Sequence, residues 1–199
     1  MFIRFLSILV FLTLFNSISG QDNSSLSTGA ESQSDNSKNA AYVELLGKGG
    51  IYSINFEREV YRINEEIAFN ASIGFSLMNG YTDVEKSKDF LLPLEINVKY
   101  SFDKHHVVLG YGTTLWKYKV IDVKIDNSNI GDSPAAPTLK PMKEWFAHLT
   151  LEYRYQKPEG GLLIKAGITP LWFDYMSYSA FSKNANFQMW PNLGVGWAF

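Results

Sequence analysis

The carboxyl-terminal stretch Phe187-Gln188-Met189-Trp190-Pro191-Asn192-Leu193-Gly194-Val195-Gly196-Trp197-Ala198-Phe199 decides the fold class. Its odd-numbered positions are nearly all large and apolar, whereas its even-numbered positions are mostly small or polar. A β-strand places alternate residues on opposite faces. The stretch therefore predicts a strand with one apolar face and one face of small and polar side chains.

The same alternation recurs along most of the chain after residue 40. We predict eight strands, at residues 41–46, 50–60, 66–77, 91–102, 105–117, 143–156, 161–174 and 186–199. An even number of strands puts both ends of the domain on one side, so we interpret Gly47–Gly50 as the turn of a hairpin. One long strand with a glycine bulge is the alternative that the pattern leaves open.

The face with small and polar side chains, which we call the weaker face, distinguishes a soluble β-protein from a membrane β-barrel. It carries glycine, serine and asparagine together with ionisable residues such as Glu95 and Lys99. Glycine weakens a strand and packs against nothing on a solvated surface, but inside a narrow barrel it leaves room for charged side chains. Short and long connections also alternate, and aromatic residues gather near strand ends, as in outer-membrane barrels. We therefore predict an all-β, eight-stranded antiparallel transmembrane up-and-down barrel in a bacterial outer membrane.

The residues before this region have a different character. Arg4 is followed by an apolar run over residues 5–15 and small residues over 16–20, a pattern typical of an export signal. Residues 21–39 are rich in Ser, Asn, Asp and Gly and have almost no large apolar residue. We predict a signal peptide at 1–20, a disordered periplasmic lead-in at 21–39 and an outer-membrane barrel at 40–199.

Composition limits the chemistry that the chain can support. The 199 residues include no cysteine, which excludes disulfides and thiolate metal sites, and the net charge is −2. No basic face points to nucleic acid, and no spacing resembles a zinc or calcium site. We expect no cofactor and no metal, a monomer, and two kinds of partner: outer-membrane lipids including lipopolysaccharide, and the barrel-assembly machinery during insertion.

Charged residues on the weaker face form the first candidate site, a lumen charge network. An eight-stranded barrel is only wide enough for side chains, and an unpaired buried charge is costly, so these groups should pair. They either fill the lumen as a static network or form a gated ion or proton path. The residues are Glu44, Glu57, Glu95, Lys99, Glu152, Arg154 and Lys165.

Two prolines form the second candidate site. Pro170 and Pro191 fall on adjacent predicted strands at similar heights, and neither can donate to the sheet. They could leave a lateral gap that admits a lipid chain, a feature that resembles lipid A palmitoyltransferase barrels. The interpretation that we favour is a pair of tolerated bulges or a device that curves the outer rim. Nearby, we expect His148 to face the lumen near Glu152 in a structural hydrogen bond.

A third candidate is a group of lysines around the longest connection. Lys117, Lys119, Lys140 and Lys143 flank the excursion over residues 118–142 on the long-loop side. They either contact lipopolysaccharide phosphates or form a solvated loop base. We expect the outer parts of this excursion to continue the strand hairpin, with 127–137 as its tip.

Several motifs resemble those of known barrels. Phe199, at the end of an alternating strand, resembles the carboxyl-terminal signal that the barrel-assembly machinery reads. Small barrels of Bacteroidota-type bacteria have motifs similar to Tyr42–Gly47, Ser53–Arg58, Tyr153–Gln156 with Gly160-Gly161, and Gly167–Leu171. The resemblance implies the fold and the outer-membrane location and carries no settled activity. We expect a non-enzymatic structural or surface-interaction role, with a lipid-modifying enzyme or a narrow ion or solute channel as alternatives.

Overall fold

The computed structural model describes residues 37–80, 87–122, 138–173 and 187–199, all of which belong to one compact unit, Asp35–Phe199. The predicted signal peptide and residues 21–36 of the predicted lead-in lie outside the described residues. No helix among the described residues is long and apolar enough to cross a membrane.

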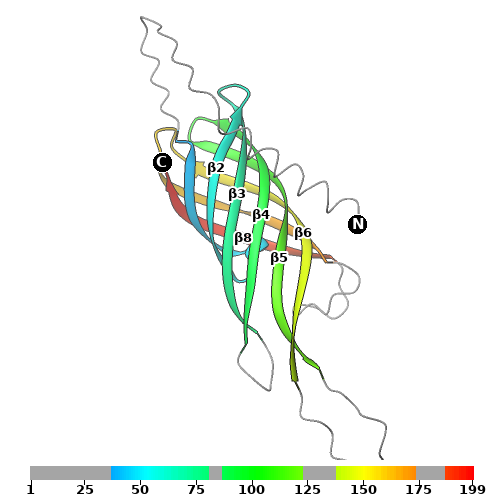
Figure 1. Ribbon diagram of the computed structural model, residues 1–199. Coiled ribbons are helices and arrows are strands. Elements are labelled where there is room, and N and C mark those ends of the chain that lie inside the picture. The colour runs from blue at the N-terminus through cyan, green and yellow to red at the C-terminus, as the bar shows by residue number, and fades with distance from the viewer. Residues whose placement is uncertain (1–36, 81–86, 123–137, 174–186) are drawn as a thin grey trace, which may run out of the picture. The chain divides into compact units, whose positions relative to one another are not determined.

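Eight antiparallel strands close into one barrel, in which each strand pairs with its sequence neighbours and the first pairs with the last (Figure 1). The predicted all-β, eight-stranded antiparallel barrel is confirmed. The elements are β1 (Asn39–Leu46), η2 (Gly47–Gly49), β2 (Tyr52–Arg62), β3 (Ile67–Gly80), β4 (Ser87–Phe102), β5 (His105–Asp122), β6 (Thr138–Gln156), β7 (Gly161–Trp172) and β8 (Phe187–Ala198).

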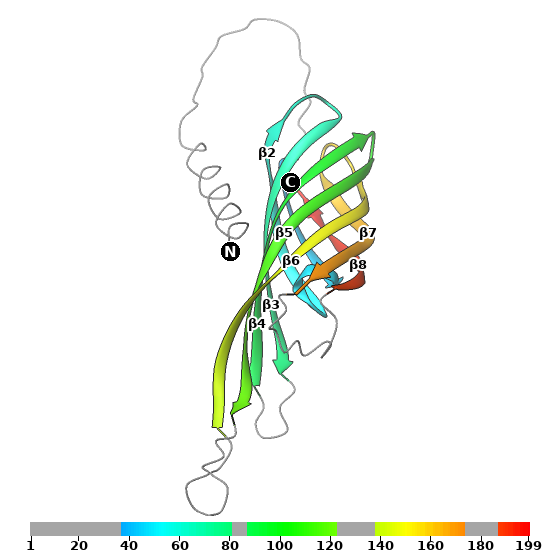
Figure 2. The same ribbon diagram turned by 90° about the vertical axis from the view of Figure 1, so that its right-hand side faces the viewer.

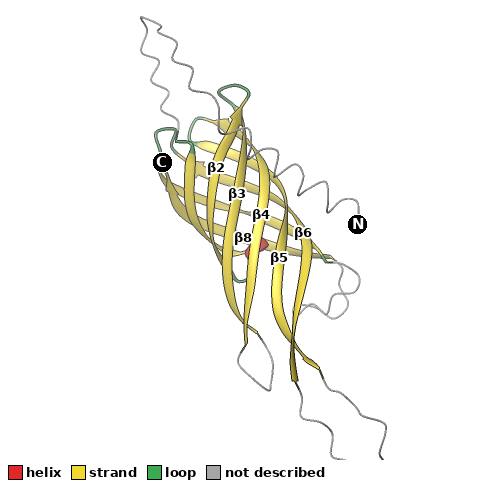
Figure 3. Cartoon of the chain, viewed as in Figure 1, coloured by secondary structure: helices red, strands yellow, loops and turns green. Residues whose placement is uncertain are grey.

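The first two strands form a hairpin, as the parity argument predicted, rather than one bulged strand. Gly47 and Gly50 each have φ of +81°, a conformation open to glycine, and Leu46 also adopts a positive φ of 62°. These three residues bend the chain into the single turn of 3₁₀ helix η2, the short helix visible within the barrel (Figure 3). The bend is what turns the hairpin tip toward the lumen.

The two ends of the barrel differ in their connections. Residues 63–66, 103–104 and 157–160 connect strands at one end, which we call the short-turn end. The other end, the long-loop end, carries η2 and the connections over 81–86, 123–137 and 173–186. The backbone N–H groups of Asn39 and Phe199 each donate to the other residue's carbonyl, so the start of β1 and the chain's last residue meet at the short-turn end.

Strands β5 and β6 are longer than the sequence indicated. Their pairing continues from Tyr118↔Met142 to Asp122↔Thr138, past the predicted strand ends at 117 and 143. Two views show β3 to β6 continuing beyond the ends of β7 and β8 at the long-loop end (Figures 1 and 2). The expectation that the long excursion continues the hairpin is therefore confirmed up to Asp122 and Thr138, and the predicted tip at 127–137 lies outside the described residues.

The two faces of the strands have opposite chemistry. Large apolar side chains on the outward face are exposed on every strand. Examples are Val43, Ile54, Ile73, Ile96, Leu109, Leu151, Ile164 and Val195. The inward face holds polar and charged side chains in the middle of the barrel. Its long-loop end instead holds an apolar cluster that includes Leu91, Trp116, Phe146 and Leu171.

Candidate functional site: a charge network in the barrel lumen

All seven residues predicted to form the lumen charge network are buried. Lys48, which the sequence reasoning did not assign to the lumen, joins them from η2. Lys48, Arg154 and Lys165 are each only 1 % exposed. Cations so completely removed from water require carboxylate partners.

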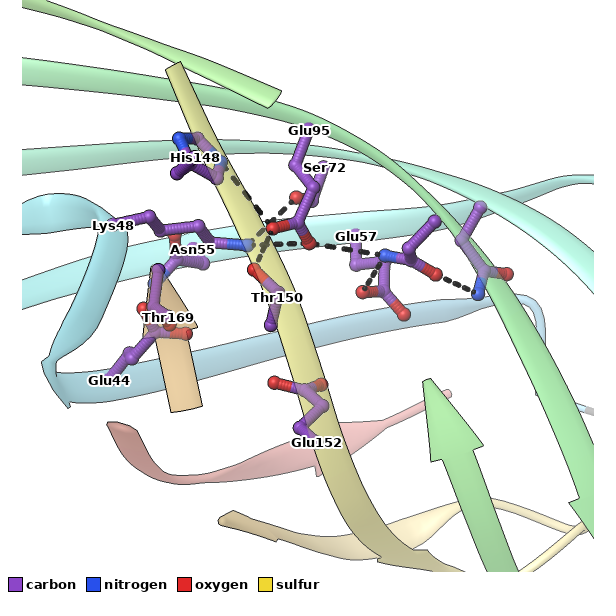
Figure 4. A network of polar contacts seen from close by, with 12 residues as sticks. Glu44, Lys48, Asn55, Glu57, Ser72, Glu95, His148, Thr150, Glu152 and Thr169 are labelled. Carbon is purple, nitrogen blue, oxygen red and sulfur yellow. Dashed lines mark hydrogen bonds and ion pairs between the residues drawn. The ribbon is translucent and has the colours of Figure 1, made fainter. Parts of the chain in front are cut away.

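The part of the network near the long-loop end is centred on Glu95 of β4. The Lys48 ammonium lies 2.9 Å from Glu95 Oε1, and the Thr150 hydroxyl donates to Glu95 Oε2 at 2.6 Å (Figure 4). His148 Nε2 lies 3.5 Å from the same Oε2 atom. The hydroxyl of Thr114 also donates to the Lys48 carbonyl at 2.9 Å. The hairpin tip is therefore fixed inside the lumen through both its side chain and its backbone.

The part nearer the short-turn end is centred on Arg154 of β6. Its guanidinium donates two hydrogen bonds to Glu57, at 2.6 and 3.0 Å, and a third to Glu152 at 2.9 Å. The Lys165 ammonium lies 2.8 Å from Glu152 and 2.6 Å from Glu44. Cations and carboxylates thus alternate around the inner wall, and every contact joins opposite charges.

Asn97 connects the two parts. Its side-chain N–H group lies 3.1 Å from Glu57 Oε2 and 3.4 Å from Glu95 Oε1, while Asn70 donates to its carbonyl oxygen at 2.8 Å. The polar contacts therefore form one continuous network from Lys48 to Glu44. Because members of such a network polarise one another, it should respond as a unit when one member is removed.

A third cluster lies at the short-turn end, where the Arg62 guanidinium donates to Glu59 at 2.6 and 2.7 Å and the Lys99 ammonium lies 3.8 Å from Glu59. With this cluster included, five carboxylates face five cations, so the charges of these ion pairs balance. The carboxylates are Glu44, Glu57, Glu59, Glu95 and Glu152, and the cations are Lys48, Arg62, Lys99, Arg154 and Lys165.

His148 faces the lumen, as expected, but its carboxylate partner is Glu95 and not the predicted Glu152. The stagger of neighbouring strands sets which inward side chains share a height, and the sequence does not reveal that stagger. No group of three or more His, Cys, Asp or Glu residues within the described ranges could hold a metal ion.

The two prolines lie on adjacent strands, and the pairing of β7 with β8 is unbroken past both of them. The strand pairing is interrupted instead between β6 and β7. There Leu149 and Thr150 of β6 lie opposite the part of β7 that contains Pro170, and neither has a paired residue in β7. This follows because proline cannot donate to the neighbouring strand. A lateral opening between β7 and β8 at Pro170 and Pro191 stays a prediction that this pairing does not favour.

We expect Lys48→Met to destabilise the barrel by about 3 kcal/mol, the lower end of the range for a broken buried ion pair. Glu95 would lose its cation but keep contacts with Thr150 and His148. The measurement is urea unfolding in detergent micelles, with Lys104→Met in the exposed turn between β4 and β5 as the control. Equal unfolding midpoints for the two variants would contradict the placement of Lys48 in the lumen.

No protein-family model matches the chain, and no curated protein matches it. Among solved structures, the fold is similar to the N-terminal β-barrel domain of Pseudomonas aeruginosa OprF, with 12 % sequence identity and a TM-score of 0.44. The match covers 83 % of this chain and 98 % of that domain. The likeness to small Bacteroidota-type barrels therefore rests on the sequence motifs alone.

Proposed function

We propose that this protein is a non-enzymatic bacterial outer-membrane barrel with a closed lumen, which serves the cell envelope through its structure and its surface. The observation that carries the proposal is the distribution of side chains across the wall. Apolar residues are exposed around the whole outward face, and the ten charged residues of the lumen ion pairs point inward. In water such a surface would promote association, whereas in a bilayer it is the surface that lipid chains require.

The height of the apolar band fits a bilayer. On β4, the outward face begins with Phe102 and Tyr100 at the short-turn end and reaches Phe90 at the other end. The thirteen residues from Phe90 to Phe102 span about 40 Å along the strand, or about 30 Å along the barrel axis at a tilt of about 40°. That height matches a hydrocarbon core of about 30 Å. In the closed ladder every strand pairs with two neighbours, as a membrane-spanning sheet requires.

The lumen network favours a structural role over conduction. An eight-stranded barrel has an interior filled by side chains. Here the filling includes η2, which sits inside the wall, and ten charged groups that pair with one another. An ion crossing this lumen would have to separate several buried ion pairs at once. We infer that the barrel does not conduct and that the protein's interactions take place on its outer surface.

The first test is heat modifiability of the protein from an outer-membrane fraction, comparing boiled and unboiled samples on a denaturing gel. We expect a faster-migrating unboiled band, because the closed ladder resists detergent until heated. Recovery of the protein as a single band from the soluble periplasmic fraction would overturn the proposal.

Two further measurements separate this role from its alternatives. Planar bilayers containing the folded protein should stay silent between pH 5 and pH 8, and steady single-channel currents would favour a channel instead. The lipid A mass profile of a deletion strain should be unchanged, and a missing acylated species would favour a lipid-modifying enzyme.

A further inference from the structure

We propose that the outward face of β4, β5 and β6 at the long-loop end binds the phosphate groups of lipopolysaccharide. This inference rests on the proposed membrane function and names a lipid partner for it. The face carries four exposed lysines, which we call the lysine patch: Lys88, Lys117, Lys119 and Lys143. Lys140 flanks the same connection, but strand alternation places it on the opposite face of β6.

The patch brings like charges together. Lys117 of β5 and Lys143 of β6 are directly paired across the two strands, on the same outward face. Side chains in such pairs have Cβ atoms about 5 Å apart, and like charges in this position destabilise a sheet. The ammonium of Lys117 lies 5.5 Å from the centre of the Phe90 ring. An arrangement of this kind becomes favourable when an anion lies between the two ammonium groups.

The patch has no carboxylate partner within the described part of the chain. None of its four lysines forms an ion pair there, whereas two acidic residues near the patch on the same strands, Asp89 and Glu144, lie on the inward side. Tyr118 donates to Glu144, and Trp116 donates to Asp89 at 3.3 Å. Within the described part of the chain, these carboxylates and the four patch lysines thus lie on opposite faces of the sheet, and the lysines are open to an external anion.

The position of the patch along the strands indicates which kind of anion it meets. Along β4, Lys88 comes one outward position after Phe90, and along β6, Lys143 comes one outward position after Trp145. The lysines therefore follow directly on the aromatic residues at the boundary of the apolar band, where lipid phosphates lie. A lipid that carries both phosphate groups and acyl chains fits this patch next to an apolar wall.

The number of lysines favours lipopolysaccharide over an ordinary phospholipid. One phosphodiester carries a single negative charge and would leave most of the patch uncompensated. The lipid A portion of lipopolysaccharide carries phosphate groups at both ends of its sugar unit, so it can reach several lysines at once. Charge-assisted hydrogen bonds from lysine to phosphate are among the stronger polar contacts in proteins.

The test compares the full chain, folded in detergent, with Lys117→Gln/Lys143→Gln and with the matched control Lys104→Gln/Lys157→Gln at the short-turn end. Native mass spectrometry measures retention of purified lipopolysaccharide, of its enzymatically dephosphorylated form and of phosphatidylglycerol. We expect the patch variant to bind lipopolysaccharide about tenfold more weakly than the control variant, as loss of two charge-assisted contacts predicts. Dephosphorylated lipopolysaccharide should bind the unsubstituted chain as weakly as lipopolysaccharide binds the patch variant.

Three outcomes would overturn the inference: equal binding by the patch and control variants, equal binding of the dephosphorylated lipid, or tighter binding of phosphatidylglycerol than of lipopolysaccharide. The gel assay keeps this inference separate from the proposed function. If the protein gives a heat-modifiable band but does not bind lipopolysaccharide selectively, the inference about the lysine patch is wrong and the proposed function stands. The substitutions should leave that band in place, because they remove a like-charge pair from the sheet.

Discussion

Arg154→Met is expected to lower the free energy of unfolding by about 3–5 kcal/mol, the range for a buried ion pair that loses one partner. Arg154 is 1 % exposed and is the only ionic partner of Glu57 within the described lumen. Without it, Glu57 would keep a single neutral donor, Asn97, and would carry a buried charge with no cation beside it. Glu152 is less affected because Lys165 remains in contact with it.

The measurement is equilibrium unfolding in urea, in micelles or vesicles, followed by tryptophan fluorescence. Arg58→Met is the matched control, since Arg58 is next to Glu57 in β2 and exposed on the opposite face. The double variant Glu57→Gln/Arg154→Met should recover more than half of the loss, because it removes the orphaned carboxylate together with its cation. If Arg154→Met unfolds at the same urea concentration as Arg58→Met, the network does not support the barrel.

Gly196→Val is expected to prevent closure between β1 and β8, with a destabilisation above about 4 kcal/mol. Gly196 is paired with Tyr42 across this junction. A Cβ atom at Gly196 would lie 2.2 Å from the carbonyl oxygen of Ala41 and 2.4 Å from Tyr42 Cβ. Tyr42 cannot easily move away, because it is 2 % exposed and the Lys165 ammonium lies 4.2 Å from the centre of its ring.

The readout is the fraction of refolded protein that gives the heat-modifiable band. Ala41→Val is the matched control, because Ala41 lies at the same junction and its side chain is exposed on the outward face. We expect that variant to stay within about 0.5 kcal/mol of the unsubstituted chain. Gly196→Ala should fall between the two. A full folded band for Gly196→Val would show that the pairing of Tyr42 with Gly196 is wrong.

The fold could be predicted from the sequence because alternation reports directly which side chains share a face of a strand. The strand count needed a further argument, that both ends of the domain lie on one side, which divided residues 41–60 into two strands at Gly47–Gly50. The lengths of the strands were harder to predict from the sequence. Beyond Leu115 the outward residues of β5 become Lys117 and Lys119, so the apolar alternation ends while the hydrogen-bonded ladder continues.

The sequence predicted most of the residues of the lumen charge network but not which of them contact one another. Alternation placed Glu95 and Arg154 on the inward face, yet their partners depend on the stagger of the strands, which has no signature in a single sequence. For that reason the predicted partner of His148, Glu152, was wrong. Lys48 was missed for a different reason, because it belongs to a glycine-rich turn, and a turn that bends into the lumen has no periodic pattern to reveal it.

The turned-in hairpin tip constrains the order in which the chain can assemble. Ala40 at the start of the barrel pairs with Ala198 at its end, so the last junction joins segments separated by nearly the entire domain. Closing such a distant contact is slow, since the chain between must be organised first. Lys48 contacts Glu95 of β4, so the hairpin tip has to enter the lumen for the charge network to form. We expect closure of the barrel and filling of its lumen to be coupled, because a barrel closed without the hairpin tip inside would leave the buried Glu95 without its cation.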